Sequence, residues 1–390
     1  MLTPDRPLRL QIPALIAVRL VFNTMHRMVY PFLSYFSAGL GVNLAAMAAA
    51  LTLRSVSGMF SPFLASVADS RGRKAGMLLG MLLFTFGVGL VVFWPVYPAF
   101  ALALVFTTIG NLVFIPSMQA YLGDRVAYRR RGLVIALTEL SWSLGFIVGV
   151  PAVGFLIAQR GWLAPFPLLA LLGLLSLALL AWMLPRDPAR SASQTGFLRN
   201  IGRVFSYPPA LAGLLMAACY STANEVINFV FGVWVGDSFG LVLAGLGTLT
   251  FGIGLAEMGG ESLVGALTDR MGKPRAVAIG LALNCLAALA LPLTANWLPG
   301  AIGALMLFFL SFEFTLVSGI PLMTEILPPA RATLMAAHMA FISFGRAVGD
   351  VLAPLLFNQH FLPGIAANAL AAVLFNLLAV LALTRIKISQ

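Results

Sequence analysis

Apolar runs long enough to cross a bilayer recur along nearly the whole chain. A helix needs about 20 apolar residues to span roughly 30 Å of hydrocarbon, and such runs take up most of the 390 residues. Only 9% of the residues are charged and 60% are hydrophobic, a mixture that soluble globular chains do not have. The sequence therefore predicts an all-α integral membrane protein with twelve spans, near 12–38, 43–67, 75–97, 98–122, 132–158, 162–184, 207–236, 242–267, 275–295, 300–326, 332–357 and 363–384.

Positive charges gather on one side of these predicted spans. With the N-terminus inside, the cytoplasmic segments hold 19 of the 24 Lys and Arg residues, and the opposite face holds only Arg160. The remaining four lie within apolar runs, at Arg19, Arg27, Arg54 and Arg346. Since positive residues stay in cytoplasmic loops, we expect a multi-pass protein of the cell membrane, such as a bacterial inner membrane, with both termini cytoplasmic. The net charge of +11 then needs no nucleic acid as a partner.

Motifs of soluble chemistry do not fit this pattern. Cys219 and Cys285 both fall within predicted spans, so we expect no disulfide framework and no metal site. The segment "GDSFG" (236–240) matches a serine-hydrolase motif, but that motif needs a strand-to-helix elbow in an α/β domain. With no nucleotide-binding loop and no zinc-protease motif in the sequence, we predict neither an enzyme nor a cofactor.

The chain divides near its middle into two similar halves. The one extended polar stretch, rich in Pro, Ser and Arg, covers residues 185–209. We therefore predict an N-terminal six-helix bundle at 1–184, a cytoplasmic linker at 185–206 and a C-terminal six-helix bundle at 207–390. An offset of 200 superimposes several residues of the two halves, namely Asp69, Gly72, Arg73, Phe114, Arg131, Gly145 and Gly149 on Asp269, Gly272, Lys273, Phe314, Arg331, Gly345 and Gly349.

The repeated charged turn resembles a motif of the major facilitator superfamily. The family motif, G-x-x-x-D-R/K-x-G-R-R/K, lies between helices 2 and 3 and recurs weakly between helices 8 and 9. The first copy here, "ASVADSRGRK" (65–74), has Ala and Ser in place of the leading Gly and the first basic residue, and the second, "GALTDRMGKP" (265–274), ends in Pro. The resemblance implies two pseudo-symmetric six-helix bundles and transport by alternating access, and it says little about substrate.

The same resemblance implies a cytoplasmic gate. In the family the acid of the motif faces the end of helix 11, and the second Arg meets an acid that ends helix 4, which is Asp124 in this sequence. Carried over, Asp69, Arg73 and Asp124, with Asp269 in the second copy, would hold the cytoplasmic side closed. A purely topological role for these charges is the alternative.

A polar stripe on the first span marks a candidate cavity. Arg19, Asn23, His26, Arg27 and Tyr30 follow helical spacing and share one face. Span 7 answers with Tyr220, Asn224, Glu225 and Asn228, and span 10 carries Glu313. Because helices 1, 4, 7 and 10 line the central path in the resembling family, we predict that these residues form the substrate cavity. Interhelical hydrogen bonds are the structural alternative.

Two further groups of ionisable residues lie within the spans, where each costs at least about 2.5 kcal/mol to insert. Arg54 on span 2 and the pair Arg346 and Asp350 on span 11 could form a charge network between the halves, structural or switching. Buried carboxylates are suited to bind and release a proton, so proton coupling is predicted at Glu139, Glu225, Glu257, Glu261 and Glu313.

These features together favour a secondary active transporter. Residues 145–154, "GFIVGVPAVG", resemble the antiporter signature of drug-export families, with one residue inserted before the Pro. Our leading hypothesis is proton-coupled export of small amphipathic organic compounds by a monomer in the lipid bilayer. The alternatives are a proton-coupled symporter of an organic anion held by Arg19 and Arg27, a lipid or lysolipid transporter, and a membrane receptor or scaffold that transports nothing.

Overall fold

A computed structural model of the chain describes residues 7–63, 72–127, 134, 137–185 and 195–386, and the regular elements in these ranges are all helical. The first half contains α1 (Leu8–Arg27), α2 (Leu33–Leu40), α3 (Leu44–Gly58), α5 (Arg73–Phe93), α6 (Tyr97–Arg125), α8 (Ser141–Leu144), the π-helical turn η1 (Gly145–Gly149), α9 (Val150–Arg160) and α10 (Pro165–Met183). The second half contains α11 (Thr195–Ser206), α12 (Pro208–Asn228), α13 (Phe231–Phe239), α14 (Leu243–Met271), α15 (Lys273–Leu293), α16 (Leu298–Ile326), the 3-10 turn η2 (Pro328–Ala330), α17 (Arg331–Phe357) and α18 (Ala366–Leu383).

Helices lie at each of the twelve predicted positions, but not all of them meet a strict length and hydropathy criterion. Within the described residues, ten helical segments are long and apolar enough to cross a membrane. The pair α2 and α3, bent by 109° at its break, would raise this to eleven. The segment outside the count is α14, which carries Glu257 and Glu261 in its middle. The prediction of an all-α membrane protein is confirmed. Twelve spans are consistent with this structure, although only ten or eleven of its described segments meet the length and hydropathy criterion.

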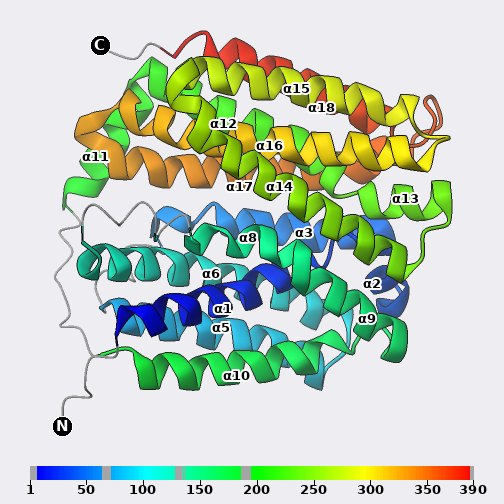
Figure 1. Cartoon of the computed structure of the whole chain (residues 1–390), viewed down its shortest axis with the longest axis horizontal. Coiled ribbons are helices and arrows are strands. Elements are labelled where there is room, and N and C mark those ends of the chain that lie inside the picture. Colours follow the sequence, from blue (N-terminus) through cyan, green and yellow to red (C-terminus); the bar gives the residue numbers. More distant parts are fainter. Residues whose placement is uncertain (1–6, 64–71, 128–133, 135–136, 186–194, 387–390) are drawn as a thin grey trace.

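Figure 1 shows how the two halves of the sequence lie relative to each other. The elements up to α10 form one layer of roughly parallel helices, and α12 and the elements after it form the other. The layers contact each other along α3 with α17 and along α9 and η1 with α14. Both ends of the described chain lie at the same end of the bundle. Residues 195–206, which we expected in the linker, form α11, and this helix contacts α12 and α17.

The repeat seen in the sequence recurs in backbone geometry. Gly72 precedes α5 with φ of 89°, and Gly272 precedes α15 with φ of 85°, a conformation that side chains rarely adopt. A Cβ atom on Gly80 would lie 2.9 Å from the Phe114 Cβ, and one on Gly280 would lie 3.1 Å from a ring carbon of Phe314. The same close helix packing therefore occurs at the same offset in both halves.

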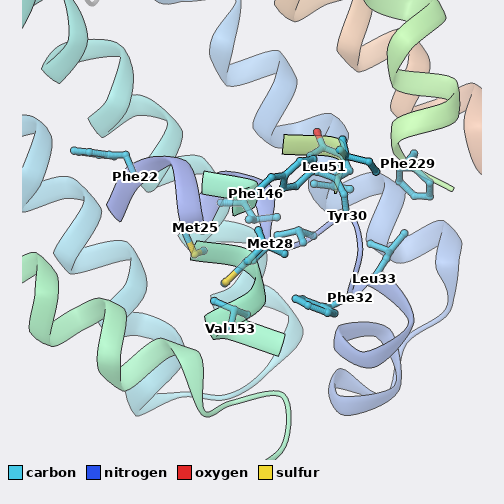
Figure 2. Packing of buried hydrophobic residues seen from close by; sticks show 14 of the residues in the cluster. Phe22, Met25, Met28, Tyr30, Phe32, Leu33, Leu51, Phe146, Val153 and Phe229 are labelled. Carbon is cyan, nitrogen blue, oxygen red and sulfur yellow. The ribbon is translucent and has the colours of Figure 1, made fainter. Parts of the chain in front are cut away.

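A large apolar core surrounds the middle of the bundle. Figure 2 shows part of it, where Met25 of α1, Met28 directly after α1, Leu51 of α3 and Phe229 beyond α12 belong to one buried cluster. At the end of the bundle that carries α2 and α13, the two halves touch through backbone. A Cβ atom on Gly232 would lie 2.6 Å from the Pro31 carbonyl oxygen, so the halves are in direct contact at this end.

The helix that spans 137–160 contains an irregular turn. Residues Gly145–Gly149 form a π-helical turn, directly before Pro151 in α9. Gly149 lies against α1, where any side chain would collide with Thr24. A π turn inserts one residue into an α-helix and often occurs at functional sites. This turn covers the first part of the segment that resembles the antiporter signature.

Candidate substrate and proton site

One polar pocket lies between the two halves. It draws residues from α1, α8, η1, α12, α14, α16 and α17, and none from α6, although the resembling family implied helix 4 as a wall. Its volume is about 20 Å³, which is room for about one water molecule. The pocket is lined by His26, Arg27, Tyr30, Trp142, Phe146, Asn224, Glu225, Asn228, Glu257, Phe309, Phe312, Glu313 and Arg346.

Arg27 is held on several sides at the centre of this pocket. Its Nη2 donates to Glu257 Oε1 at 2.5 Å, and its Nη1 donates to the Trp142 carbonyl at 3.0 Å. The guanidinium carbon lies 4.4 Å from the Trp142 ring centre and 3.4 Å from that of Phe146. Arg27 and Glu257 are 3% and 2% exposed, so they form a buried ion pair between the halves. Arg27 lines the predicted cavity, but its charge is compensated by the protein.

Two predicted cavity residues of α1 lie outside the pocket and face the helix containing α8. Arg19 makes a two-pronged contact with Glu139, with nitrogen to oxygen distances of 2.7 and 2.5 Å, and Asn23 donates to Ser141 at 3.1 Å. The Glu139 side chain is 42% exposed. Arg19 is therefore part of the packing of one half, because its fork matches the Glu139 carboxylate. We correct its assignment as an anion-binding residue of the cavity.

Glu313 and Glu261 reach from the second half to the helix around Trp142. Trp142 Nε1 donates to Glu313 Oε1 at 3.0 Å, and the Ser143 hydroxyl donates to Glu261 Oε1 at 3.1 Å. Glu313 is 2% exposed and makes no ion pair with a described residue. Helix α14, which carries Glu257 and Glu261, contacts α8, η1 and α9 of the helix that carries Glu139. Glu261 accepts there from the neutral Ser143 hydroxyl, whereas Glu257 pairs with Arg27 of α1.

A second set of contacts crosses between the halves next to the pocket. The Tyr30 hydroxyl donates to Glu225 Oε1 at 2.6 Å and accepts a hydrogen bond from Arg54 Nη2. The Ser55 hydroxyl donates to Asp350 Oδ2 at 2.7 Å. Asp350 thus contacts the first half through Ser55, and Arg54 reaches the contact between the halves only through Tyr30.

Arg346 and Asp350 are separated by one helical turn but do not pair in this structure. Asp350 is fully buried against Ser55 of α3, whereas Arg346 lines the pocket. The two side chains therefore leave α17 toward different neighbours. We correct the predicted pairing of these two residues accordingly.

The pocket lining differs from the predicted cavity at Tyr220, which was predicted to line it, and at Trp142 and Phe146, which were not predicted. Tyr220 is buried and does not line the pocket, and its hydroxyl oxygen lies 3.4 Å from Nε2 of His338. Trp142 and Phe146 enclose Arg27, yet no polar spacing in the sequence points to them. The available signal was a Trp next to the polar residues Glu139, Ser141 and Ser143 within a predicted span.

The charged turns form equivalent ion pairs in the two halves. Arg73 Nε lies 3.7 Å from Asp124 Oδ2, joining the start of α5 to the end of α6. Lys273 pairs with Glu325, joining the start of α15 to the end of α16. Glu325 was not predicted as a partner of Lys273, although it lies 201 residues after Asp124, close to the repeat offset of 200. Asp69 lies outside the described residues, as does the side chain of Asp269.

Comparison with known proteins agrees with this architecture. A family model described as Major Facilitator Superfamily matches residues 15–349. The chain belongs to the major facilitator superfamily. It is 26% identical over 325 residues to the uncharacterized MFS-type transporter YceJ of Bacillus subtilis, covering 82% of this chain and 81% of that protein. It is 29% identical over 153 residues to the multidrug resistance protein fnx1 of Schizosaccharomyces pombe, and this match covers 38% of this chain and 28% of that protein.

A solved structure shares the fold over nearly the full length. The bacterial homolog of the human lysosomal transporter Spinster, in an inward-facing and unoccupied conformation, has a TM-score of 0.72, 15% identity, and coverage of 98% of this chain and 95% of that one. The chain is therefore a multi-pass membrane transporter of this superfamily and not an enzyme. Within the described residues, no group of three or more His, Cys, Asp or Glu side chains could hold a metal ion.

Proposed function

We propose that this chain is a proton-coupled secondary transporter that exports small amphipathic organic compounds across the cell membrane. The two six-helix bundles would rock around the polar pocket, with both termini in the cytoplasm. The end that carries α2 and α13 would then face outward, and the contact of Gly232 with Pro31 would close the pocket from that side. The pocket has room for about one water, so substrate binding would require the halves to separate at the opposite end.

Glu313 is the observation that carries the proposal of proton coupling. Its carboxyl group is buried at the junction of the halves, and its one contact there is the neutral Trp142 indole. An isolated charge at membrane depth costs at least about 2.5 kcal/mol, and binding a proton removes that cost. Glu261 and Glu225 are supporting candidates, since Ser143 and Tyr30 are their hydrogen-bond donors. Glu257 and Glu139 are weaker candidates because an Arg already compensates each of them.

The direction of transport rests on weaker support. The π turn and Pro151 lie in the segment that resembles the signature of drug-export antiporters. The relative fnx1 carries the name of a multidrug resistance protein, although it matches only 38% of this chain. Both features favour export over uptake.

A proteoliposome experiment tests the coupling. Purified protein with a pH-sensitive dye inside the vesicles is given benzylamine, phenylbutylamine, octylamine and the carboxylates benzoate, phenylbutyrate and octanoate, one at a time. We expect at least one compound to move protons faster into vesicles with wild-type protein than into protein-free vesicles, and we expect Glu313→Gln to abolish this difference while the compound still binds. Asp237→Asn, an exposed change on α13, is the matched control and should behave as wild type. Wild-type proton movement in Glu313→Gln would contradict the proposal.

Lipid transport is a second candidate because of one apolar recess. A cavity of about 440 Å³ lies between α9 and α14, at the junction of the halves, and is lined by residues such as Phe155, Leu243 and Phe251. It would admit an acyl chain from the bilayer. Transfer of a fluorescent phospholipid between leaflets, in the same vesicles, would favour this candidate over export of small compounds.

A further inference from the structure

Three of the four arginines within the spans have protein partners, and one does not. Arg19 pairs with Glu139, Arg27 pairs with Glu257, and Arg54 donates to the Tyr30 hydroxyl and to the His26 carbonyl. Arg346 lines the pocket and is half-buried, but it makes no hydrogen bond or ion pair with any residue that the structure describes. A guanidinium at this depth, with five N–H donors, requires an acceptor.

Two amides beside Arg346 share this feature. Asn224 and Asn228 lie one helical turn apart on α12, line the same pocket, and are 5% and 8% exposed. Neither side chain forms a hydrogen bond within the described part of the chain, and the buried Oδ1 of Asn224 has no partner. Buried polar groups are normally hydrogen-bonded. The wall formed by α12 and α17 therefore presents several unused donors to one small space.

The acids around the pocket do not supply the missing acceptor. Asp350, one turn from Arg346, is held by Ser55 of α3. Glu257 is held by Arg27, Glu225 accepts from Tyr30, and Glu313 accepts from Trp142. Each of these carboxyl groups thus has a hydrogen-bond donor in the first half, and none of them forms an ion pair with Arg346 among the described residues.

We propose that Arg346, Asn224 and Asn228 bind the carboxylate group of an amphipathic substrate. A guanidinium matches a carboxylate through two parallel hydrogen bonds, and the two amides add neutral donors. Phe309 and Phe312 of α16 line the same pocket and provide an apolar surface for the rest of the molecule. This inference rests on the proposed transport function and narrows its substrates to organic acids, including zwitterions. It also moves the anion site from Arg19 and Arg27 of the first half to the second half.

Equilibrium binding to the purified protein tests this site. The probes are benzoate, phenylbutyrate and octanoate, with benzylamine, phenylbutylamine and octylamine as cations of matching shape, measured by calorimetry. We expect at least one carboxylate to bind, and Arg346→Gln to weaken it by about 10-fold to 100-fold, the loss of a charge-assisted hydrogen bond. The affinity of Arg346→Lys for the carboxylate should lie between those of the wild type and Arg346→Gln, since lysine keeps the positive charge but cannot form two parallel hydrogen bonds. Asn228→Ala should cause a smaller loss of the same selectivity.

The controls separate binding from folding and from coupling. Arg275→Gln removes an exposed arginine and should bind like wild type, and thermal melting of each variant reports folding. Wild-type protein that binds no carboxylate at millimolar concentration, an unchanged affinity in Arg346→Gln, or equal losses for carboxylates and amines would each overturn the site. Binding needs no pH gradient, so a carboxylate that binds at Arg346 but moves no protons would contradict the proposed function and leave the site standing.

Discussion

The two halves of this transporter hold the arginines within their apolar helices in different ways. In the first half, Arg19, Arg27 and Arg54 all lie within apolar helices and all have protein partners. In the second half, Arg346 and the two asparagines of α12 line the pocket without hydrogen-bond partners among the described residues. In our proposal, the charges that already have protein partners hold the structure together, and Arg346 is available to a ligand. Depth in the membrane alone does not distinguish these two roles.

Loss of Arg27 should have the largest effect. Arg27→Ala leaves Glu257 buried at 2% exposure with no cation, and breaking a buried pair in this way costs about 3 to 5 kcal/mol. We expect a large fall in the midpoint of thermal unfolding in detergent. Arg346→Ala, which removes an arginine of the same pocket that has no partner among the described residues, should melt close to wild type. Similar losses in the two variants would contradict the contrast between the halves.

A double substitution sharpens the same comparison. If the destabilisation by Arg27→Ala comes from an uncompensated Glu257, adding Glu257→Gln should restore much of the melting temperature. If it comes from lost packing against Trp142 and Phe146, the second change should restore nothing. The measurement is the interaction energy of a double-mutant cycle.

Tyr30→Phe should have an intermediate effect. It removes the hydroxyl that donates to Glu225 and accepts from Arg54, and hydrogen bonds to charged groups contribute about 1.5 to 3 kcal/mol. Tyr35→Phe is the matched control, since Tyr35 is less buried and makes no side-chain hydrogen bond with a described residue. Thermal melting should separate the two variants, and equal melting curves would show that the Tyr30 bridge does not stabilise the contact between halves.

Changes at the two charged turns should affect stability least. The partners Asp124 and Glu325 are 49% and 41% exposed, and exposed ion pairs contribute about 0 to 1 kcal/mol. We expect Arg73→Ala and Lys273→Ala to melt near the wild-type temperature. If the turns act as a gate, transport in proteoliposomes should slow while substrate affinity is retained. Wild-type transport in both variants would mean that these charges fix topology only.

The sequence predicted the fold well because its signals are local. Length and hydropathy of each run determine the spans, and the offset of 200 revealed Gly72 and Gly272, whose backbone conformations agree. The spans and the paired glycines depend on residues close in sequence or on a repeated pattern. The contact between Arg73 and Asp124 was implied by the resemblance to the family.

The partners inside the bundle could not be predicted in the same way. Arg27 and Glu257 are 230 residues apart, and their contact depends on how α1 and α14 are rotated toward each other. In helices that are apolar on nearly every face, spacing leaves this rotation open. The sequence therefore found most of the polar residues of the site, but it assigned the anion-binding role to Arg19 and Arg27, whose charges the protein compensates.

The π turn at Gly145–Gly149 sets the direction of the residues that precede it. One residue corresponds to about 100° of rotation in an α-helix, so deleting a residue here would turn the segment with Trp142 by more than a quarter of a circle relative to α9. Trp142 would then lose both its hydrogen bond to Glu313 and its contact with the Arg27 guanidinium. The single extra residue of the π turn thus fixes the direction in which Trp142 points. If that turn relaxed to a regular α-helix during the transport cycle, the same rotation would break the contacts of Trp142 with Glu313 and with Arg27 together.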